Sequence, residues 1–246
     1  MSSASTSVAN AFVTLTQVSR PASWIFGPIL YTIGRIHSRS PLNLTISAVL
    51  CLLAQMFALS SPLCIIVFGV NDVFDYASDV QNPRKLADNL EGGVLAPQSH
   101  QLVLRAAKIS TFFIFATFGL TTTLTTLSIT ALLLLFSWSY STPPIRLKSI
   151  PVIDSLSNGL IVLLTYLIGF SSSSESGLSF SEVPLRGKGG VFALCTTGVH
   201  ALGAVLDAEF DEKVGVRSVA VGLGQRGAAA FGAMCLYVFT FSIFFF

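Results

Sequence analysis

The sequence predicts an all-α membrane protein, a polytopic helical bundle of about seven transmembrane helices. Hydrophobic residues make up 52% of the 246 residues, charged residues make up only 11%, and the mean hydropathy is +0.73. A soluble domain carries about 25% charged residues, so this composition is typical of a chain that lies mostly in lipid. The net charge of +2 gives no support for nucleic-acid binding, and the four cysteines lack the spacing of a zinc site.

Seven apolar runs are candidates to cross a hydrocarbon layer of about 30 Å. They are residues 22–36, 44–70, 103–121, 123–140, 152–171, 190–206 and 227–246. We divide 103–140 at the polar stretch Thr121–Thr126, because one unbroken helix there would be about 57 Å long. Residues 1–19 are rich in Ser and Thr and are expected to form a flexible tail, whereas residues 20–246 are expected to form a single transmembrane domain.

Two clusters of acidic residues follow the second and sixth of these runs. Asp72, Asp75 and Asp79 form the first cluster, and the second contains Asp207, Glu209, Asp211 and Glu212. Because four spans separate the clusters, both are expected on the same face of the membrane. That face would hold ten Lys and Arg residues against four on the other, which predicts that it is the cytosol-like side.

The spacing within each cluster favours a metal site. At about 100° per helical residue, the first three aspartates lie within about 60° of one another, and Asp207 and Asp211 lie within about 40°. Glu209 and Glu212 point elsewhere and are weaker candidates. Convergent carboxylates repel unless a cation intervenes, and their oxygen atoms favour Mg²⁺ or Ca²⁺, with Mg²⁺ often shared with a diphosphate. The alternative is a set of solvated loop acids balanced by nearby Lys and Arg.

These residues also carry a family resemblance. NDVFDYASD, residues Asn71–Asp79, resembles the NDxxDxxxD motif of the UbiA superfamily of intramembrane prenyltransferases, and DAEFD, residues Asp207–Asp211, resembles its DxxxD motif. YSTPPIRLKSIPVID, residues Tyr140–Asp154, resembles that family's loop between helices four and five. The resemblance covers residues 20–235 and implies a lipid-open cavity in which Mg²⁺ holds an isoprenyl diphosphate. It implies catalytic and metal-binding roles for Asp72, Asp75, Asp79, Asp207 and Asp211, with Asn71 as a further metal ligand.

Several other residues are candidates to support this chemistry. Lys148 matches the family's loop lysine, and Arg146, Arg84 and Lys85 are further candidates to bind diphosphate oxygens, although each could simply anchor its loop at the membrane surface. Tyr140 and Tyr76 are weaker candidates to stabilise an allylic cation with their ring faces. His200 lies seven residues before Asp207 and either accepts a substrate proton or, as is commoner, bonds a neighbouring helix.

The residues in and around both motifs look most like those of the lycopene elongase branch of the family. The expected function is Mg²⁺-dependent transfer of a prenyl group to a lipophilic acceptor, which could be aromatic, carotenoid or another isoprenoid. The alternatives are a terpene cyclase that acts on one diphosphate, and a non-enzymatic ion transporter or lipid-binding protein. The family usually has nine helices and this chain stops at Phe246, so we expect either a C-terminal truncation or a cavity closed by fewer helices or by oligomerisation.

Overall fold

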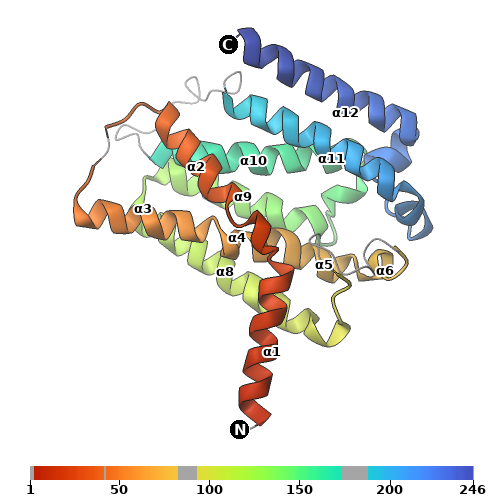
Figure 1. The fold of residues 1–246 in the computed structure, drawn as a ribbon, viewed down its shortest axis with the longest axis horizontal. Helices are drawn as coiled ribbons and strands as arrows, with labels where there is room; N and C mark the ends of the chain where they lie inside the picture. The colour runs from red at the N-terminus through yellow and green to blue at the C-terminus, as the bar shows by residue number, and fades with distance from the viewer. Residues whose placement is uncertain (1–2, 42, 83–92, 173–187, 246) are drawn as a thin grey trace. The chain divides into compact units, whose positions relative to one another are not determined.

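The computed structural model describes residues 3–41, 43–82, 93–172 and 188–245, and every regular element in these ranges is helical (Figure 1). The chain forms two compact units. Unit 1 contains Met1–Ile29 and Leu42–Thr121, and unit 2 contains Leu30–Pro41 and Thr122–Phe246. The single domain expected over residues 20–246 therefore stays a prediction, and each unit is taken in turn below.

Six helical stretches among the described residues are long and apolar enough to cross a membrane, which confirms the predicted all-α membrane class. They are Ile46–Phe74, Pro97–Thr121, Leu124–Ser141, Ile153–Ser172, Lys188–Lys213 and Val219–Val238. The first expected span, 22–36, is shorter than predicted. Its helix α2, Phe26–His37, has 12 residues and a length of about 18 Å, because the 3₁₀ turn η1 (Pro21–Ser23) occupies the preceding residues.

The expected flexible tail is wrong over most of its length. Residues Ser3–Val18 form helix α1, and Val18 is buried in a cluster with Leu95 and Val103, against which Leu15 also packs. Leu15 and Val18 are three residues apart, so they lie on the same face of the helix. The many Ser and Thr residues had suggested disorder, but this apolar pair is enough to attach the C-terminal end of α1 to the core of unit 1.

Unit 1 contains an interrupted helix that leads to the first acidic motif. Helix α3 (Ile46–Ala58) begins at Thr45, whose hydroxyl accepts a hydrogen bond from the backbone N–H of Ala48. The chain restarts at Ser60, where Pro62 removes a backbone donor from the next turn. It then continues through α4 (Ser61–Cys64), the π-helical segment η2 (Ile65–Gly69), α5 (Val70–Phe74) and α6 (Tyr76–Asp79).

The second part of unit 1 packs against this interrupted helix. The 3₁₀ turn η3 (Pro97–Ser99) leads into α8 (His100–Thr121), and α8 contacts α3, α4, η2 and α5. Gly69 is closely packed, because a Cβ atom there would come within 2.9 Å of a methyl carbon of Val103. A small residue at the end of η2 therefore lets the motif-bearing segment approach α8.

The described residues of unit 2 contain four long helices in sequence. They are α9 (Leu124–Ser141), α10 (Ile153–Ser172), α11 (Lys188–Lys213) and α12 (Val219–Phe245), with the short turn η4 (Leu147–Ser149) between α9 and α10. Helix α10 packs against both α9 and α11, and α11 lies beside α12 (Figure 1). The predicted break between residues 121 and 126 is confirmed, because α8 ends at Thr121 and the Thr123 hydroxyl caps α9.

Glycines permit the close helix contacts of unit 2. Gly34 of α2 lies against the backbone of Tyr166 on α10, and a Cβ atom at Gly159 of α10 would clash with Ala193 and Thr197 of α11. Gly198 of α11 and Gly232 of α12 face each other in the same way. Such small residues let helix backbones approach inside membranes, where there is little hydrophobic drive between helices.

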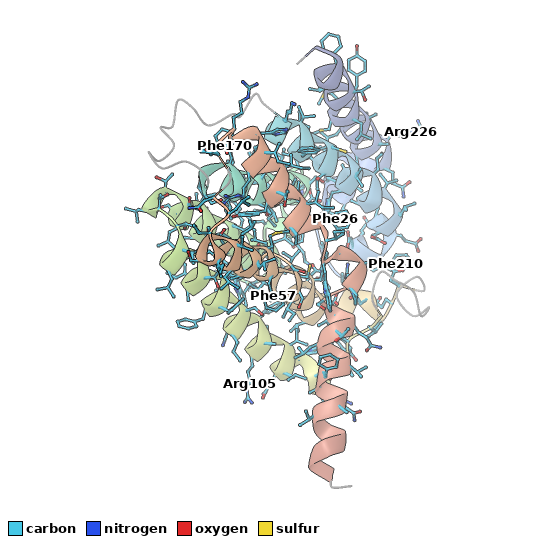
Figure 2. All side chains as sticks on the ribbon, turned by 60° about the vertical axis from the view of Figure 1, so that its left-hand side comes forward. Phe26, Phe57, Arg105, Phe170, Phe210 and Arg226 are labelled. Carbon is cyan, nitrogen blue, oxygen red and sulfur yellow. The ribbon has the colours of Figure 1, made fainter. Side chains whose placement is uncertain are left out.

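Large apolar side chains cover much of the outer surface of the helices. Phe112 is 76% exposed and Leu120 is 87% exposed on α8, and Phe57 of α3 is 58% exposed. Figure 2 shows Phe57 beside α3 and the charged Arg105 at an outer edge of α8. In water such surfaces would favour aggregation, so this pattern agrees with helices that face lipid.

Candidate active site

The first acidic motif lies in unit 1, where the apolar stretch Ile46–Phe74 ends. The π-helical segment η2 immediately precedes it, and such segments occur frequently at functional sites. The helix is interrupted again at Asp75, which separates α5 from α6. The expected convergence of Asp72, Asp75 and Asp79 stays a prediction.

Asp72 forms an ion pair with Arg20, which precedes it by 52 residues in the sequence. Its carboxylate is 2% exposed and accepts a hydrogen bond from Nη2 of Arg20 at 2.9 Å. Arg20 has a left-handed backbone with φ of 51°, and its guanidinium lies 4.5 Å from the centre of the Phe68 ring. The ion pair compensates a buried negative charge that would otherwise be costly.

Sequence reasoning counted Arg20 only among the positive charges of one membrane face. The partners are 52 residues apart, so no helical periodicity relates them. A signal was present, since Arg20 directly precedes Pro21 and the first apolar run, where a cation would lie near the membrane surface.

The other members of the first motif differ in burial. Asp79 is 7% exposed, whereas Asn71 and Asp75 are half-buried. Tyr76, also half-buried, packs edge-on against the ring of His100, with the ring centres 5.4 Å apart. The cation-stabilising role of Tyr76 stays a prediction.

The second motif lies in unit 2, near the C-terminal end of the continuous helix α11. Asp207 and Asp211 are half-buried, whereas Glu209 and Glu212 are exposed. Glu209 forms a surface ion pair with Lys213 at 2.7 Å. In this regular helix, the separation expected between the aspartates and the glutamates is observed.

Lys148 lies beside the second motif. It belongs to the turn η4 and is 7% exposed, and it is close enough to Asp211 to act on that carboxylate electrostatically. A lysine is rarely buried without compensation, so the acidic motif explains its position. Arg146, which precedes η4, is half-buried and has a left-handed backbone with φ of 45°. Arg84 and Lys85 lie outside the described residues.

His200 joins three helices of unit 2. Its Nε2 atom lies 2.9 Å from the Tyr140 hydroxyl on α9, and its Nδ1 atom lies 3.1 Å from the Ser155 hydroxyl on α10. The expectation that His200 bonds neighbouring helices is confirmed. The cation-stabilising role of Tyr140 stays a prediction.

Asp154, which sequence reasoning passed over, anchors the start of two helices. It is 1% exposed, and its carboxylate accepts hydrogen bonds from the backbone N–H groups of Ser155 at 2.6 Å and Val219 at 2.7 Å. An aspartate shortly after Pro151, before an apolar run, is a recognisable signal for a helix start. Its bond to Val219, 65 residues away, has no such signal.

The donor chemistry of both motifs fits Mg²⁺, because they offer only carboxylate and amide oxygens. Within the described residues, however, no three His, Cys, Asp or Glu side chains converge on one point as a metal site. Asp72 points instead toward Arg20. The predicted ligands Asn71, Asp72, Asp75, Asp79, Asp207 and Asp211 therefore stay a prediction.

Taken together, these features define a class of protein. The chain has six apolar helices of spanning length among the described residues, and an acidic motif lies near the ends of two of them. Arg20 accompanies the first motif and Lys148 the second. This combination is typical of an integral membrane enzyme that handles a negatively charged, metal-bound group at the edge of the lipid.

Comparison with known proteins identifies the family. The sequence model of the UbiA prenyltransferase family matches residues 25–246, and the chain belongs to this family. It is therefore a multi-pass membrane prenyltransferase, which replaces the transporter and lipid-scaffold alternative.

Its relatives include a lycopene elongase/hydratase from Corynebacterium glutamicum, 36% identical over 216 residues that cover 85% of this chain and 69% of the relative. A second, from Halobacterium salinarum, is 31% identical over 223 residues, which cover 88% of this chain and 73% of that protein. These relatives confirm the lycopene elongase-like branch that the motifs predicted.

Solved structures show the same fold. A UbiA homologue from Archaeoglobus fulgidus, bound to DMAPP and Mg²⁺, has a TM-score of 0.72 at 19% identity, covering 93% of this chain and 76% of that one. The apo UbiA homologue from Aeropyrum pernix K1 has a TM-score of 0.68 at 21% identity, covering 87% of this chain and 74% of that one. At these identities, the likeness shows the fold alone.

Proposed function

We propose that this prenyltransferase ionises dimethylallyl diphosphate in the presence of Mg²⁺ and transfers the C5 unit to the end of a carotenoid. The observation that carries the proposal is that each acidic motif is accompanied by a cation of its own unit, Arg20 or Lys148. A metal-bound diphosphate needs both kinds of group, carboxylates for the metal and cations for the oxygens that the metal leaves uncovered. The names of the relatives, and the DMAPP and Mg²⁺ of the Archaeoglobus homologue, support the choice of substrates.

The chain's own residues divide into two groups in this reaction. The oxygen donors that would hold Mg²⁺ are Asn71, Asp72, Asp75, Asp79, Asp207 and Asp211. When bound, Mg²⁺ would supply charge stabilisation to the diphosphate as the allylic C–O bond breaks. Lys148 would bind a diphosphate oxygen as a point charge, and Arg146 would offer a bidentate fork. Arg84 and Lys85 are proposed for the same role on sequence grounds.

Asp72 has a second role in this proposal, because it is already engaged by Arg20. The second carboxylate oxygen of Asp72 could bind a metal while Oδ1 keeps its bond to Arg20, which would hold the guanidinium close to the incoming diphosphate. The aromatic ring of Phe68, against which Arg20 lies, helps to keep the guanidinium near this position, since a cation over a ring is stabilised by about 0.5–2 kcal/mol.

The apolar helices complete the proposal, because they would bind the lipophilic acceptor and keep water from the allylic cation. Tyr140 and Tyr76 are proposed to present their rings to that cation. From the distribution of Lys and Arg along the sequence, we place both acidic motifs on the cytosol-like face.

The proposal is tested with purified protein in lipid nanodiscs, labelled dimethylallyl diphosphate, lycopene and Mg²⁺. Mass spectrometry should find lycopene made heavier by one or two C5 units, with or without added water, and chelation of the metal should abolish the product. A panel of C5 to C20 diphosphates then defines the donor length.

Two results would overturn the proposal. Diphosphate release that yields a cyclic hydrocarbon without any acceptor would identify a terpene cyclase. Transfer to aromatic acids or quinone precursors but never to a carotenoid would show that the protein is a prenyltransferase whose acceptor is not a carotenoid. Asp207→Asn, measured beside wild type, shows whether product depends on the second motif.

A further inference from the structure

His200 has an unusual pair of hydrogen-bond partners. Both of its ring nitrogens contact hydroxyl groups, that of Tyr140 at 2.9 Å and that of Ser155 at 3.1 Å. His100 differs, because its Nε2 atom contacts the backbone carbonyl of Leu95, which can only accept and so requires a proton on that nitrogen. Hydroxyl groups both donate and accept, so a proton can move between His200 and its partners without loss of a hydrogen bond.

The two hydroxyl contacts allow the hydrogen bonds of His200 to run in either direction. In one direction the Tyr140 O–H donates to Nε2 of His200. The neutral ring then carries its proton on Nδ1 and donates it to Ser155, which is fully buried.

The position of the network relates it to the second motif. His200 lies seven residues before Asp207 on the same helix, about two turns or 10 Å along the axis, and Asp207 is close enough to act on it electrostatically. His200 lies on the side of the motif away from the helix end, within the apolar part of α11. Ser155 is buried, whereas Tyr140 and His200 are half-buried.

The proposed prenyl transfer requires a group that accepts a proton from the substrate. When the allylic C–O bond breaks, its electron pair leaves with diphosphate, and the π electrons of an acceptor double bond form the new C–C bond. The acceptor then carries a tertiary cation. Loss of a proton from the adjacent carbon lets the C–H electron pair form a new double bond, so the net products are an alkene, diphosphate and one proton.

We propose that the Tyr140 hydroxyl takes this proton from the substrate while its own proton passes to Nε2 of His200. Tyr140 is then the catalytic residue, and His200 is the positioning residue that accepts the proton behind it. This inference rests on the proposed function, because it concerns the step that follows prenyl transfer. The Ser155 hydroxyl bonds Nδ1 of His200, and this contact keeps Nε2 directed at Tyr140.

The experiment compares wild type with His200→Gln, which can form hydrogen bonds but cannot accept the proton. Diphosphate release and alkene product are measured together in the nanodisc assay, with dimethylallyl diphosphate and lycopene. We expect alkene formed per diphosphate released to fall by about tenfold or more, with water-captured products in its place. Tyr140→Phe should give the same change, and Ser155→Ala a smaller change in the same direction.

His37→Gln is the matched control. His37 contacts a tyrosine hydroxyl in unit 2 as well, with Nδ1 3.1 Å from the hydroxyl of Tyr166, but it lies in α2 rather than beside the second motif. It should keep the wild-type ratio of alkene to diphosphate. A merely structural defect lowers both quantities together and leaves their ratio unchanged.

The outcomes separate this inference from the proposed function. If wild type forms no prenylated carotenoid, the proposed function fails and the relay fails with it. If wild type forms the alkene but His200→Gln and Tyr140→Phe keep its ratio to diphosphate, the relay alone is overturned. A wild-type product that always contains added water would also overturn it, because no carbon-bound proton would then be lost.

Discussion

The two acidic motifs have similar sequences but very different surroundings. In unit 1, Asp72 and Asp79 are buried, and their segment is broken into short helices with a π-helical turn before them. In unit 2, Asp207 and Asp211 are half-buried on one continuous helix. The first motif is thus part of the packed interior of its unit, whereas the second is accessible near the end of a regular helix.

Asp72 of the first motif also has a structural role. Asp72 forms a buried ion pair with Arg20, so its removal affects packing as well as chemistry. For Asp211, no comparable buried ion pair is found among the described residues, although Lys148 lies near it. Substitutions in the two motifs should therefore have similar effects on catalysis and different effects on stability.

The largest expected effect is on turnover and is shared by both motifs. Asp72→Asn and Asp211→Asn should each lower kcat by about 10³-fold, because each removes charge that holds the metal-bound diphosphate. Metal-dependent diphosphate release measures this directly. Wild-type turnover in either variant would show that the two motifs do not share one reaction.

The next effect distinguishes the motifs by stability. Asp72→Ala leaves the Arg20 guanidinium without its carboxylate and should lower the free energy of unfolding by about 3 kcal/mol, measured by thermal unfolding in detergent. Asp211→Ala should change it much less. Glu209→Ala, which removes an exposed ion pair with Lys213, is the control and should cause no measurable change.

A double-substitution cycle tests the cause of that loss. Arg20→Met combined with Asp72→Asn removes both charges, so the double variant should be more stable than the sum of the single losses predicts. Purely additive losses would show that the ion pair does not stabilise unit 1.

A smaller effect concerns the anchoring of unit 2. Asp154→Ala removes the acceptor for the N–H of Val219 at the start of α12 and should lower the free energy of unfolding by about 1–2 kcal/mol. Asp154→Asn keeps one acceptor oxygen and should lose less. Equal losses in the two variants would argue against capping as the cause.

The motif-bearing helix α11 packs closely against α12. Gly198→Ala should destabilise the protein by about 1–2 kcal/mol, because its Cβ would press on Gly232 and Leu236. Gly203→Ala is a matched control on the same helix, since nothing lies within 4 Å of its Cβ position. It should be neutral or stabilising by less than about 1 kcal/mol, as thermal unfolding will show.

The smallest effect concerns His37 in unit 2. Burial lowers the pKa of His37 below its ordinary value, and the charge of Lys188 acts in the same direction. Because the folded pKa is the lower one, the folded state binds fewer protons. Stability should be fully present above about pH 6.5 and decline as pH falls through the folded pKa. His37→Gln should flatten this part of the stability profile, and an unchanged profile would assign it to other groups.

Sequence reasoning succeeded where local periodicity governs structure. On α11, the spacing of four residues placed Asp207 and Asp211 together and separated them from Glu209. It also located the break between α8 and α9 from a run of threonines. It was less successful for residues 1–19, where composition suggested a tail and two apolar residues anchor a helix.

The sequence by itself determined that this is a helical membrane protein of the UbiA family, because hydropathy and motif spacing are local properties of the chain. Only the tertiary structure decided which charges meet. Arg20 forms an ion pair with Asp72, 52 residues away in sequence. Asp154 accepts a hydrogen bond from the backbone N–H of Val219, 65 residues away. Such pairs are selected by burial and helix packing, which bring together groups that no periodicity relates. The contact of α5 with α8, next to the interruption at Asp75, is likewise a feature of the tertiary structure.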